Sequence, residues 1–518
     1  MKKIISLFLA VVMLVSLTAC KNNNNDGTVI EGLDFEIGDT GGLKVPFGNG
    51  EEIEILCIDD GSVSNTYIFD KLSQITGLSV KPLLIPTAAS TQKMSAIIAS
   101  GDLPEIYYQT SFTKINEYAL QGAFEPINPH MDELPNISRM FGENGKYSWF
   151  PKTYAADDGN FYFLPLTDSD RLVNHGMLYR KDTFDKHGIK MWNSPETFYQ
   201  ALKKLKEIYP DSYPLTSKTT HNIIKNYAVA WGGIVSYDMY FDEASKTWKY
   251  SDTAPETKEI LDFFNKLYNE KLLDPEFLTN TQPAWTQKMT NGKSFVTYDW
   301  IGRLDMFMEQ TEVPGYDLRY ANPVGPKQTL VTLSQVDSFG TCIAKGKKAE
   351  LALKLSDFLY SPAGAELMTI GVRGETFEFD ENGNIKYLDP ELAAKDKITT
   401  TDLAAKYAMW VRPSYRATDK RAVYYNYTER EQEAQDWVEK CGGLEPADPV
   451  ITFPDETSSR INDIKGKLAK KFEEVMFKYI IGQDSGDEAW NRWLAEAKKL
   501  GEDEICKIYN DRYKELGL

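Results

Sequence analysis

Short apolar runs alternate with amphipathic segments along the chain from Glu51 onward. Residues 53–58 and 78–85 have the apolar character of strands, whereas residues 91–100 carry apolar side chains at helical spacing and stop at Gly101. Repeated strand–helix units of this kind favour a parallel sheet with helices on both faces. We therefore expect the first part of the chain to form an α/β domain around a doubly wound sheet.

The α/β pattern continues through the middle of the chain. Residues 195–209 and 255–269 each begin with proline and place their apolar side chains on one face, which predicts two helices. Residues 377–388 alternate in polarity around Asn382-Gly383, which predicts a two-stranded hairpin.

From Asp402 onward the pattern is mostly helical. Trp490, Trp493, Leu494 and Leu500 recur at helical spacing in the last segment. A stripe of this kind is typical of a helix that packs against a core. We therefore expect these tryptophans to be buried rather than to bind a ligand.

The N-terminus has the features of a targeting segment. Two lysines precede an apolar run at residues 4–17, which is shorter than the ~20 residues that a membrane-spanning helix needs. Residues 17–20, Leu-Thr-Ala-Cys, resemble the lipobox of bacterial lipoproteins. The resemblance implies that residues 1–19 are a signal peptide and that Cys20 becomes lipidated. Two acyl chains hold a protein stably on a membrane.

Residues 20–50 are predicted to be a flexible tether. They contain four consecutive asparagines, seven glycines and few apolar side chains. Such a segment buries too little surface to offset the entropy lost on ordering. The remainder, roughly 470 residues, is too long for one hydrophobic core and predicts two or more domains.

The composition is that of an acidic globular protein. The formal net charge is −18, and the loss of Lys2 and Lys3 with the signal peptide makes it −20. Nucleic acid is disfavoured as a partner, because its recognition depends on basic patches. The overall charge also disfavours an anionic ligand, although a local arginine overrules such a preference.

Cysteine usage does not indicate a disulfide framework or a zinc site. Four cysteines follow Cys20, and none belongs to a C-x-x-C pair. Cys57 and Cys342 lie in strand-like runs and are predicted to be buried. A disulfide between Cys441 and Cys506 stays an open alternative.

Sequence motifs for catalysis or metal binding are absent. The four histidines form no H-E-x-x-H pattern, and the chain contains no G-x-S-x-G. Gly292-Lys293-Ser294 resembles the end of a P-loop but lacks the upstream glycine, and residues 380–383 fit a turn better than a calcium loop. We therefore expect no enzyme, cofactor or metal site. A glycosidase needs only two well-placed carboxylates, so it stays an alternative.

Five segments, taken in order, carry a resemblance to a known family. They are residues 99–106 (ASGDLPEI), 160–165 (NFYFLP), 178–182 (LYRKD), 267–277 (LYNEKLLDPEF) and 291–300 (NGKSFVTYDW). They are similar to segments of family 1 extracellular solute-binding proteins, and most closely to the long lipoproteins of Gram-positive carbohydrate importers. Phe163 stands where the family has glycine.

The resemblance implies an α/β, two-lobed periplasmic-binding-protein-like fold (type II), with mixed sheets flanked by helices and a ligand cleft between the lobes. The expected division is a signal peptide (1–19), a lipid-anchored flexible tether (20–50), lobe 1 (51–165 and 335–400) and lobe 2 (166–334 and 401–518), the last with a helical C-terminal extension.

The function implied by the resemblance is capture of a carbohydrate, in particular an oligosaccharide, and its delivery to the permease of an ABC importer. The protein would be a monomer without enzymatic activity, anchored by lipid at the outer face of the cytoplasmic membrane. Peptide binding, an extracellular glycosidase and a sensor partner for a membrane kinase stay alternatives.

Ligand-binding residues follow from the chemistry of sugars, which present apolar C–H faces and many hydroxyls. The resemblance implies stacking rings at Trp300, at the end of the family's Gly-Lys strand, and at Trp231, which precedes two glycines. For both rings, core packing is the alternative. The other predicted side chains follow strands or crossovers: Asp299, Tyr108, Gln109, Ser111, Asp168, Asp170 and Arg373. Trp149, Trp410 and Arg412 are weaker candidates by position.

Overall fold

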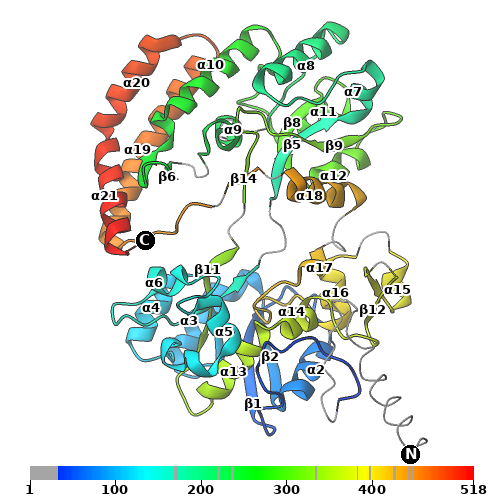
Figure 1. Ribbon diagram of the computed structural model, residues 1–518, viewed down its shortest axis with the longest axis vertical. Helices are drawn as coiled ribbons and strands as arrows, with labels where there is room; N and C mark the ends of the chain where they lie inside the picture. Colours follow the sequence, from blue (N-terminus) through cyan, green and yellow to red (C-terminus); the bar gives the residue numbers. More distant parts are fainter. Residues whose placement is uncertain are drawn as a thin grey trace, which may run out of the picture.

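The computed structural model describes residues 33–168, 173–218, 222–234, 238–332, 335–381, 383–395, 398–423, 428–441, 443–445 and 447–517. Buried apolar side chains in these ranges form two large and separate cores, with two small clusters beside the second. Figure 1 shows the two corresponding bodies one above the other. The protein is an α/β protein with two lobes. Cys20 and Asp170 lie outside the described residues.

The sheet of the first lobe has the strand order β2-β1-β3-β11-β4. Strands β1 (Glu52–Ile58), β2 (Ser79–Ile85) and β3 (Ile106–Gln109) are parallel. β11 (Val336–Ile343) runs antiparallel to both β3 and β4 (Leu164–Thr167), so the sheet is mixed and not wholly parallel. The reason is that β11 follows a segment of the second lobe and enters the sheet from the opposite end.

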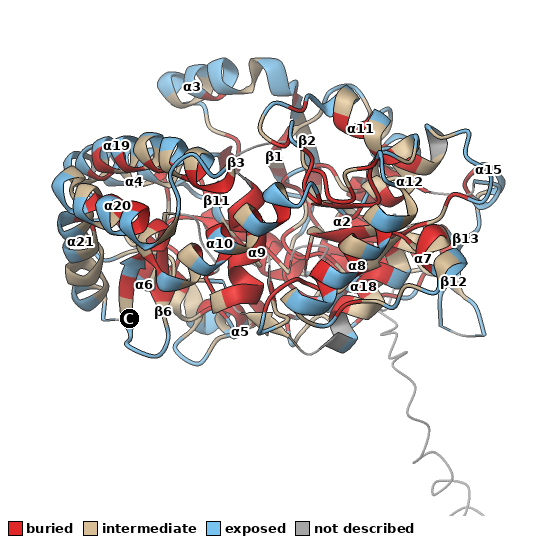
Figure 2. Ribbon diagram, turned by 90° about the horizontal axis from the view of Figure 1, so that it is seen from above, coloured by how far each residue is buried: buried red, intermediate tan, exposed pale blue. Residues whose placement is uncertain are grey.

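The α-helices of the first lobe are α2 (Tyr67–Thr76), α3 (Ser90–Ser100), α4 (Phe112–Leu120), α5 (Pro135–Phe141), α6 (Trp149–Tyr154), α13 (Ala349–Leu359), α14 (Pro362–Thr369), α15 (Pro390–Ala393), α16 (Thr400–Tyr407) and α17 (Lys420–Val423). Figure 2 shows α3 as a largely exposed helix at the margin of the buried core. The predicted hairpin is confirmed by β12 (Phe377–Phe379) and β13 (Ile385–Tyr387).

The second lobe is built around a three-stranded antiparallel sheet of order β8-β5-β9. Its strands are β5 (His175–Arg180), β8 (Val296–Trp300) and β9 (Leu318–Ala321), and two small ribbons pair β6 (Met239–Asp242) with β7 (Thr247–Tyr250) and β10 (Leu330–Val331) with β14 (Leu444–Glu445). Its helices are α7 (Lys181–His187), α8 (Pro195–Ile208), α9 (Asn222–Gly232), α10 (Pro255–Asn269), α11 (Gln282–Thr290), α12 (Arg303–Glu309) and α18 (Glu429–Cys441). The predictions of α8 and α10 are confirmed.

Three long C-terminal helices complete the second lobe: α19 (Asp455–Ile480), α20 (Gly486–Leu500) and α21 (Glu502–Glu515). Trp490 and Trp493 of α20 are buried in the second core, and the Trp493 indole N–H donates to the carbonyl of Asp252 at 2.8 Å. The prediction that the aromatic stripe packs into a core is therefore confirmed. Within the described residues, no helix combines the length and the apolarity needed to cross a membrane.

The cysteines behave as packing residues. Cys57 and Cys342 are buried free thiols of the first core, as predicted. Cys506 on α21 is also a free thiol, and the side chain of Cys441 lies outside the described part of the structure. Burial raises the pKa of the Cys57 thiol to about 12, which makes it unreactive at neutral pH.

The lobe boundaries differ from the predicted ones at two places. Phe35, Ile37 and Leu43, which fall in the predicted tether, are buried in the first core. Residues 401–423, predicted to begin the return to lobe 2, also belong to the first core through side chains such as Leu403 and Met409. Which core buries these apolar side chains depends on contacts with segments far apart in the chain, and a local pattern does not record such contacts.

The chain passes between the lobes near strand ends. It leaves the first lobe after β4, returns before β11, and leaves again between α17 and α18. The first two passages are tied together where the backbone N–H of Asp168 donates to the carbonyl of Gln335 at 2.9 Å.

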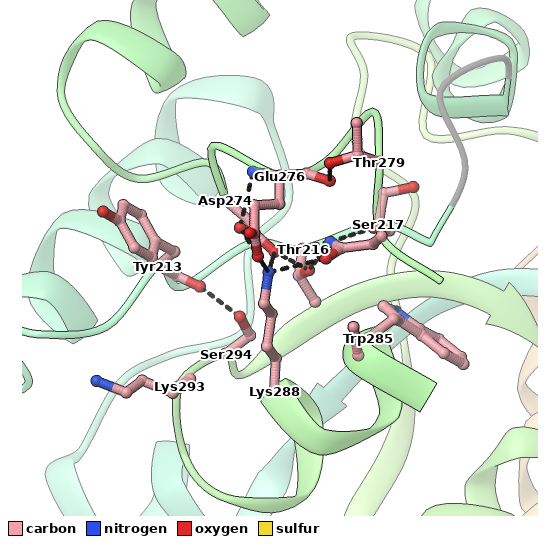
Figure 3. Close-up of polar contacts among 12 residues, drawn as sticks. Tyr213, Thr216, Ser217, Asp274, Glu276, Thr279, Trp285, Lys288, Lys293 and Ser294 are labelled. Atoms are coloured by element: carbon pink, nitrogen blue, oxygen red, sulfur yellow. Dashed lines mark hydrogen bonds and ion pairs between the residues drawn. The ribbon is translucent and has the colours of Figure 1, made fainter. Parts of the chain in front are cut away.

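A buried polar cluster positions β8, the strand that ends at Trp300. Asp274 is 1% exposed at its side chain and accepts hydrogen bonds from Lys288 at 2.8 Å and from Thr216 at 2.7 Å. Figure 3 shows the ammonium group of Lys288 directed at this carboxylate. Thr216 in turn donates its backbone N–H to the carbonyl of Val296, the first residue of β8. The cluster therefore fixes the start of β8.

Asp274→Asn should lower the free energy of unfolding by about 2–4 kcal/mol, because it removes the charge that balances Lys288 in a buried cluster. The control is Glu276→Gln, which removes a mostly exposed partner of the same lysine and should cost less than about 1 kcal/mol. Urea denaturation at pH 7 measures both. Equal effects would contradict the role given to Asp274.

The pH dependence gives a second readout of this prediction. Burial raises the pKa of Asp274, but hydrogen bonds from Lys288, Asn280 and Thr216 outweigh that effect and hold the pKa below its usual value. The carboxylate therefore stabilises the fold above about pH 4, and this contribution is lost as the pH falls through its folded pKa. The difference in the free energy of unfolding between the wild type and Asp274→Asn should therefore become smaller below about pH 4.

Candidate functional site

A narrow pocket lies in the first lobe where β3, β11 and residues 412–416 meet. It is lined by Tyr108, Leu164, Leu166, Asp337, Phe339, Gly340, Arg412, Pro413, Tyr415 and Arg416. Backbone hydrogen bonds hold the last segment against the sheet: Ile58 donates to the carbonyl of Arg412 at 2.7 Å, and Thr167 donates to that of Arg416 at 2.8 Å. The pocket thus joins residues that are hundreds of positions apart.

The pocket combines aromatic rings with charged groups. The rings of Tyr108 and Phe339 meet edge to face, with centroids 6.2 Å apart. The guanidinium of Arg412 lies 5.7 Å from the Phe339 centroid and forms an ion pair with Asp337. Burial raises the pKa of Asp337 even though Arg412 acts in the opposite direction. Such a surface offers both apolar contact and hydrogen bonding to a polar ligand.

In the second lobe, Trp300 ends β8 with its ring open to solvent. The side chain is 51% exposed, more than any other large apolar side chain among the described residues. The ring of His175 meets it nearly at right angles, with centroids 5.6 Å apart, and the guanidinium of Arg303 lies 5.6 Å from it. Burial lowers the pKa of His175, so the imidazole beside Trp300 is neutral at pH 7.

Asp299 supports this ring rather than facing solvent. Its side chain is buried and forms ion pairs with Lys218 at 2.7 Å and with Arg303 at 3.3 Å. It also accepts the backbone N–H of Trp300 at 2.7 Å. Both carboxylate oxygens are therefore engaged by protein groups, and Asp299 positions Trp300 and Arg303.

The two groups of residues lie at the two ends of one passage between the lobes. Leu166 of β4 lines the pocket, and His175 begins β5 and pairs in register with Trp300. The chain from Thr167 to His175 spans at most about 28 Å even when fully extended. Thr167, which follows the pocket residue Leu166, and His175, which contacts Trp300, are therefore at most that far apart.

Three other predicted residues lie close to the strand ends. Gln109 is buried at the end of β3, and its side-chain oxygen accepts the backbone N–H of Thr110 at 2.8 Å. Ser111 caps α4 by accepting from the backbone of Lys114. Asp168 begins the first passage and accepts hydrogen bonds from Tyr147, at 2.9 Å, and from Lys146.

Two predicted residues, Arg373 and Trp231, are each held by partners within their own lobe. Arg373 binds both oxygens of Glu366 at 2.6 and 2.8 Å. Trp231 on α9 is only 8% exposed, donates to Glu259 on α10 at 2.9 Å and packs against Phe263. The structure does not bring either residue to Trp300 or to the pocket, and the burial of Trp231 favours the packing alternative.

Several residues of these two groups were not singled out in the sequence. They are Asp337, Phe339, Tyr415 and Arg416 in the first lobe and His175, Lys218 and Arg303 in the second. The segment Arg412-Pro-Ser-Tyr-Arg416 did carry a recognisable feature, two arginines and an aromatic residue around a proline. Within the described residues, no three histidine, cysteine or acidic side chains are grouped so that they could hold a metal ion.

Comparison with known proteins adds relatives over most of the chain. The profile of the family described as bacterial extracellular solute-binding protein matches residues 60–366. Lipoprotein LipO of Bacillus subtilis (strain 168) is 23% identical over 473 residues, which cover 86% of this chain and 88% of that protein. The polygalacturonan/rhamnogalacturonan-binding protein YtcQ of the same organism is 19% identical over 463 residues, which cover 86% of this chain and 87% of that protein.

A solved structure shares the fold. The crystal structure of the alginate-binding protein AlgQ2 without calcium ion aligns with a TM-score of 0.60 and 21% identity, and covers 91% of this chain and 99% of its own.

Stability measurements distinguish the two tryptophans. Trp300→Ala should change the free energy of unfolding by less than about 1 kcal/mol, because half of the ring already contacts water. Trp231→Ala should cost about 3–5 kcal/mol, because it empties a buried site and leaves Glu259 without its donor. Chemical denaturation of both variants is the test. Similar losses in the two variants would assign Trp300 to the core.

Proposed function

Since the chain belongs to the family of bacterial extracellular solute-binding proteins, we propose that it captures an oligosaccharide and delivers it to the permease of an ABC importer. The names of YtcQ and of AlgQ2 state that these proteins bind polygalacturonan or rhamnogalacturonan and alginate. Those names support carbohydrate as the ligand class. An extracellular family also supports a site of action outside the cytoplasm.

The observation that carries this proposal is the exposed ring of Trp300. A tryptophan ring that meets His175 nearly at right angles and has Arg303 over one face, with about half of the residue in water, can stack its open surface on the C–H face of a sugar ring. Phe339 offers partly exposed aromatic surface in the first lobe, with the buried ring of Tyr108 beside it. We infer that a ligand with several sugar rings contacts both groups.

Capture is proposed to work by closure of the lobes. A ligand that touches both lobes binds the closed arrangement better than the open one and shifts the population toward it. The passages between the lobes would then act as the hinge, with the Asp168–Gln335 hydrogen bond at its base. The permease would recognise the closed arrangement.

Neither peptide binding nor glycosidase activity has a comparable observation in its favour. A peptide would need paired backbone donors and acceptors along an open strand edge. A glycosidase would need two carboxylates facing one sugar, whereas Asp299 and Asp337 are each engaged by arginine or lysine. We therefore propose that the protein binds and releases its ligand unchanged.

We further propose that the mature protein is a monomer tethered by lipid on Cys20 to the outer face of the cytoplasmic membrane. The name of the relative LipO supports a lipoprotein. The Leu-Thr-Ala-Cys pattern after the short apolar run supplies the position of the lipid.

Isothermal titration calorimetry with a panel of neutral and acidic plant-polysaccharide oligomers tests the ligand class. At least one oligomer should bind, and Trp300→Ala should weaken its binding by about 2–4 kcal/mol, since the variant loses a central apolar contact. Small-angle scattering should show a smaller radius of gyration with ligand. Val313→Ala, at another exposed apolar side chain of the same lobe, is the control and should bind normally.

The proposal fails if no oligosaccharide binds while a peptide does. It also fails if the oligomer is recovered cleaved at an enzymatic rate that depends on one carboxylate. An unchanged affinity in Trp300→Ala would remove Trp300 from the site.

The anchor is tested separately by Cys20→Ala in the bacterial host. The variant should appear in the medium or accumulate as an unprocessed precursor, because the cysteine is both the lipidated residue and the first residue after cleavage. Replacement of Cys57, a buried cysteine of the first core, should leave processing and membrane attachment unchanged. A Cys20→Ala protein that is still processed and attached would contradict the anchor.

A further inference from the structure

The pocket of the first lobe contains two arginines and one carboxylate. Arg412 is about half exposed at its side chain and is paired with Asp337. Arg416 is 1% exposed and is among the largest fully buried side chains of the described residues. The pocket therefore has one positive charge more than it has negative charges. This local excess stands against the strongly acidic composition of the whole chain.

The guanidinium of Arg416 is only partly satisfied. Its Nη1 donates to the carbonyl of Pro413 and, at 3.4 Å, to that of Tyr415. Its Nε and Nη2 are buried without a hydrogen-bond partner, and no carboxylate in the described part of the chain pairs with this side chain. A buried charge without a counter-charge is strongly unfavourable, so such a group indicates a place for an anion.

The two atoms of Arg416 without a partner are Nε and Nη2, and the same two atoms of other arginines in this protein bind carboxylates. In three ion pairs, the Nε and Nη2 atoms of an arginine hold the two oxygens of one carboxylate at 2.6–2.8 Å: Arg180–Asp182, Arg373–Glu366 and Arg460–Glu504. This side-on, bidentate geometry is specific for planar anions. Arg416 has the same two donors without a carboxylate, and both donor atoms are buried.

We propose that the oligosaccharide captured by this protein carries a carboxylate, as uronic acid residues do, and that this group binds the Nε–Nη2 edge of Arg416 with Arg412 beside it. The inference rests on the proposed capture of a sugar and narrows its class. The carboxylate would balance the excess charge of the pocket, and Tyr108 and Phe339 would contact the apolar face of the same sugar.

Two physical points support an acidic sugar over a neutral one. A hydroxyl could accept a hydrogen bond from Nε or Nη2 but would leave the buried charge unbalanced. Burial lowers the pKa of Arg416 to about 10, so the group is still charged at neutral pH. The net negative charge of the chain would act on a ligand mainly at long range, where salt screens it. The arginines of the pocket would act on a ligand in direct contact, where screening is weak.

Calorimetry with paired ligands tests the inference. Oligogalacturonate, alginate oligomers and glucuronate-substituted xylo-oligomers are each compared with the same oligomer after reduction of its carboxylates to alcohols. We expect at least one acidic oligomer to bind about 10- to 100-fold more tightly than its reduced form, the range for hydrogen bonds to a charged group.

Two variants test which residues cause the preference for acidic over reduced oligomers. Arg416→Met should abolish this preference, and Arg412→Gln should reduce it about tenfold. Arg460→Gln, which removes a side-on arginine of the second lobe, is the matched control and should keep it. Without ligand, Arg416→Met should melt no lower than the wild type, because it removes an unbalanced buried charge. If Arg416→Met does not fold, Arg412→Gln and the reduced oligomers decide the question.

The possible failures are distinguishable. Equal binding of acidic and reduced oligomers overturns the inference and leaves sugar capture standing. An acid preference that survives in Arg416→Met and Arg412→Gln also overturns it, and a much lower melting temperature in Arg416→Met with that preference intact would assign Arg416 a packing role alone. Absence of binding by every acidic, reduced and neutral oligomer overturns the proposed function itself.

Discussion

The separation of buried apolar side chains into two cores governs how this protein is built. Each core is closed by its own sheet and helices, so most buried contacts lie within a lobe. The Asp168–Gln335 hydrogen bond ties two of the passages between the lobes together. Changing the angle between the lobes therefore need not expose either core, which is the physical condition for a hinge.

Polar clusters hold the candidate ligand-binding side chains in position. Asp274 and Lys288 fix Thr216 and with it the start of β8, and Asp299 with Lys218 and Arg303 fixes its end. Trp300 can be exposed and still well oriented, because the residues that contact it are buried or partly buried. The same logic holds in the first lobe, where the 412–416 segment is hydrogen-bonded to β1 and β4 before it lines the pocket.

The charges of the protein act on two length scales. The chain as a whole is acidic, and most of its ion pairs are at the surface, where they contribute little to stability. In the pocket, by contrast, Arg416 is removed from water and has no counter-charge of its own. The net charge therefore says little about the ligand, because recognition depends on groups within hydrogen-bonding distance.

The sequence by itself determined the features that depend on neighbouring residues. Proline starts and one-sided apolar faces located α8 and α10, and helical spacing identified the buried stripe of α20. Among the candidate site residues, the family resemblance pointed to Trp300, the first-lobe strand to Tyr108 and position alone, more weakly, to Arg412.

Only the tertiary structure decided the features that depend on distant residues. The antiparallel entry of β11, the membership of residues 401–423 in the first core and the unpaired edge of Arg416 are such features. The hydroxyl of Thr167, for example, donates to the carbonyl of Arg416 across 249 positions. A hydrophobic pattern records which face of an element is buried. It does not record what that face is buried against, because the partner is set by packing between segments far apart in the chain.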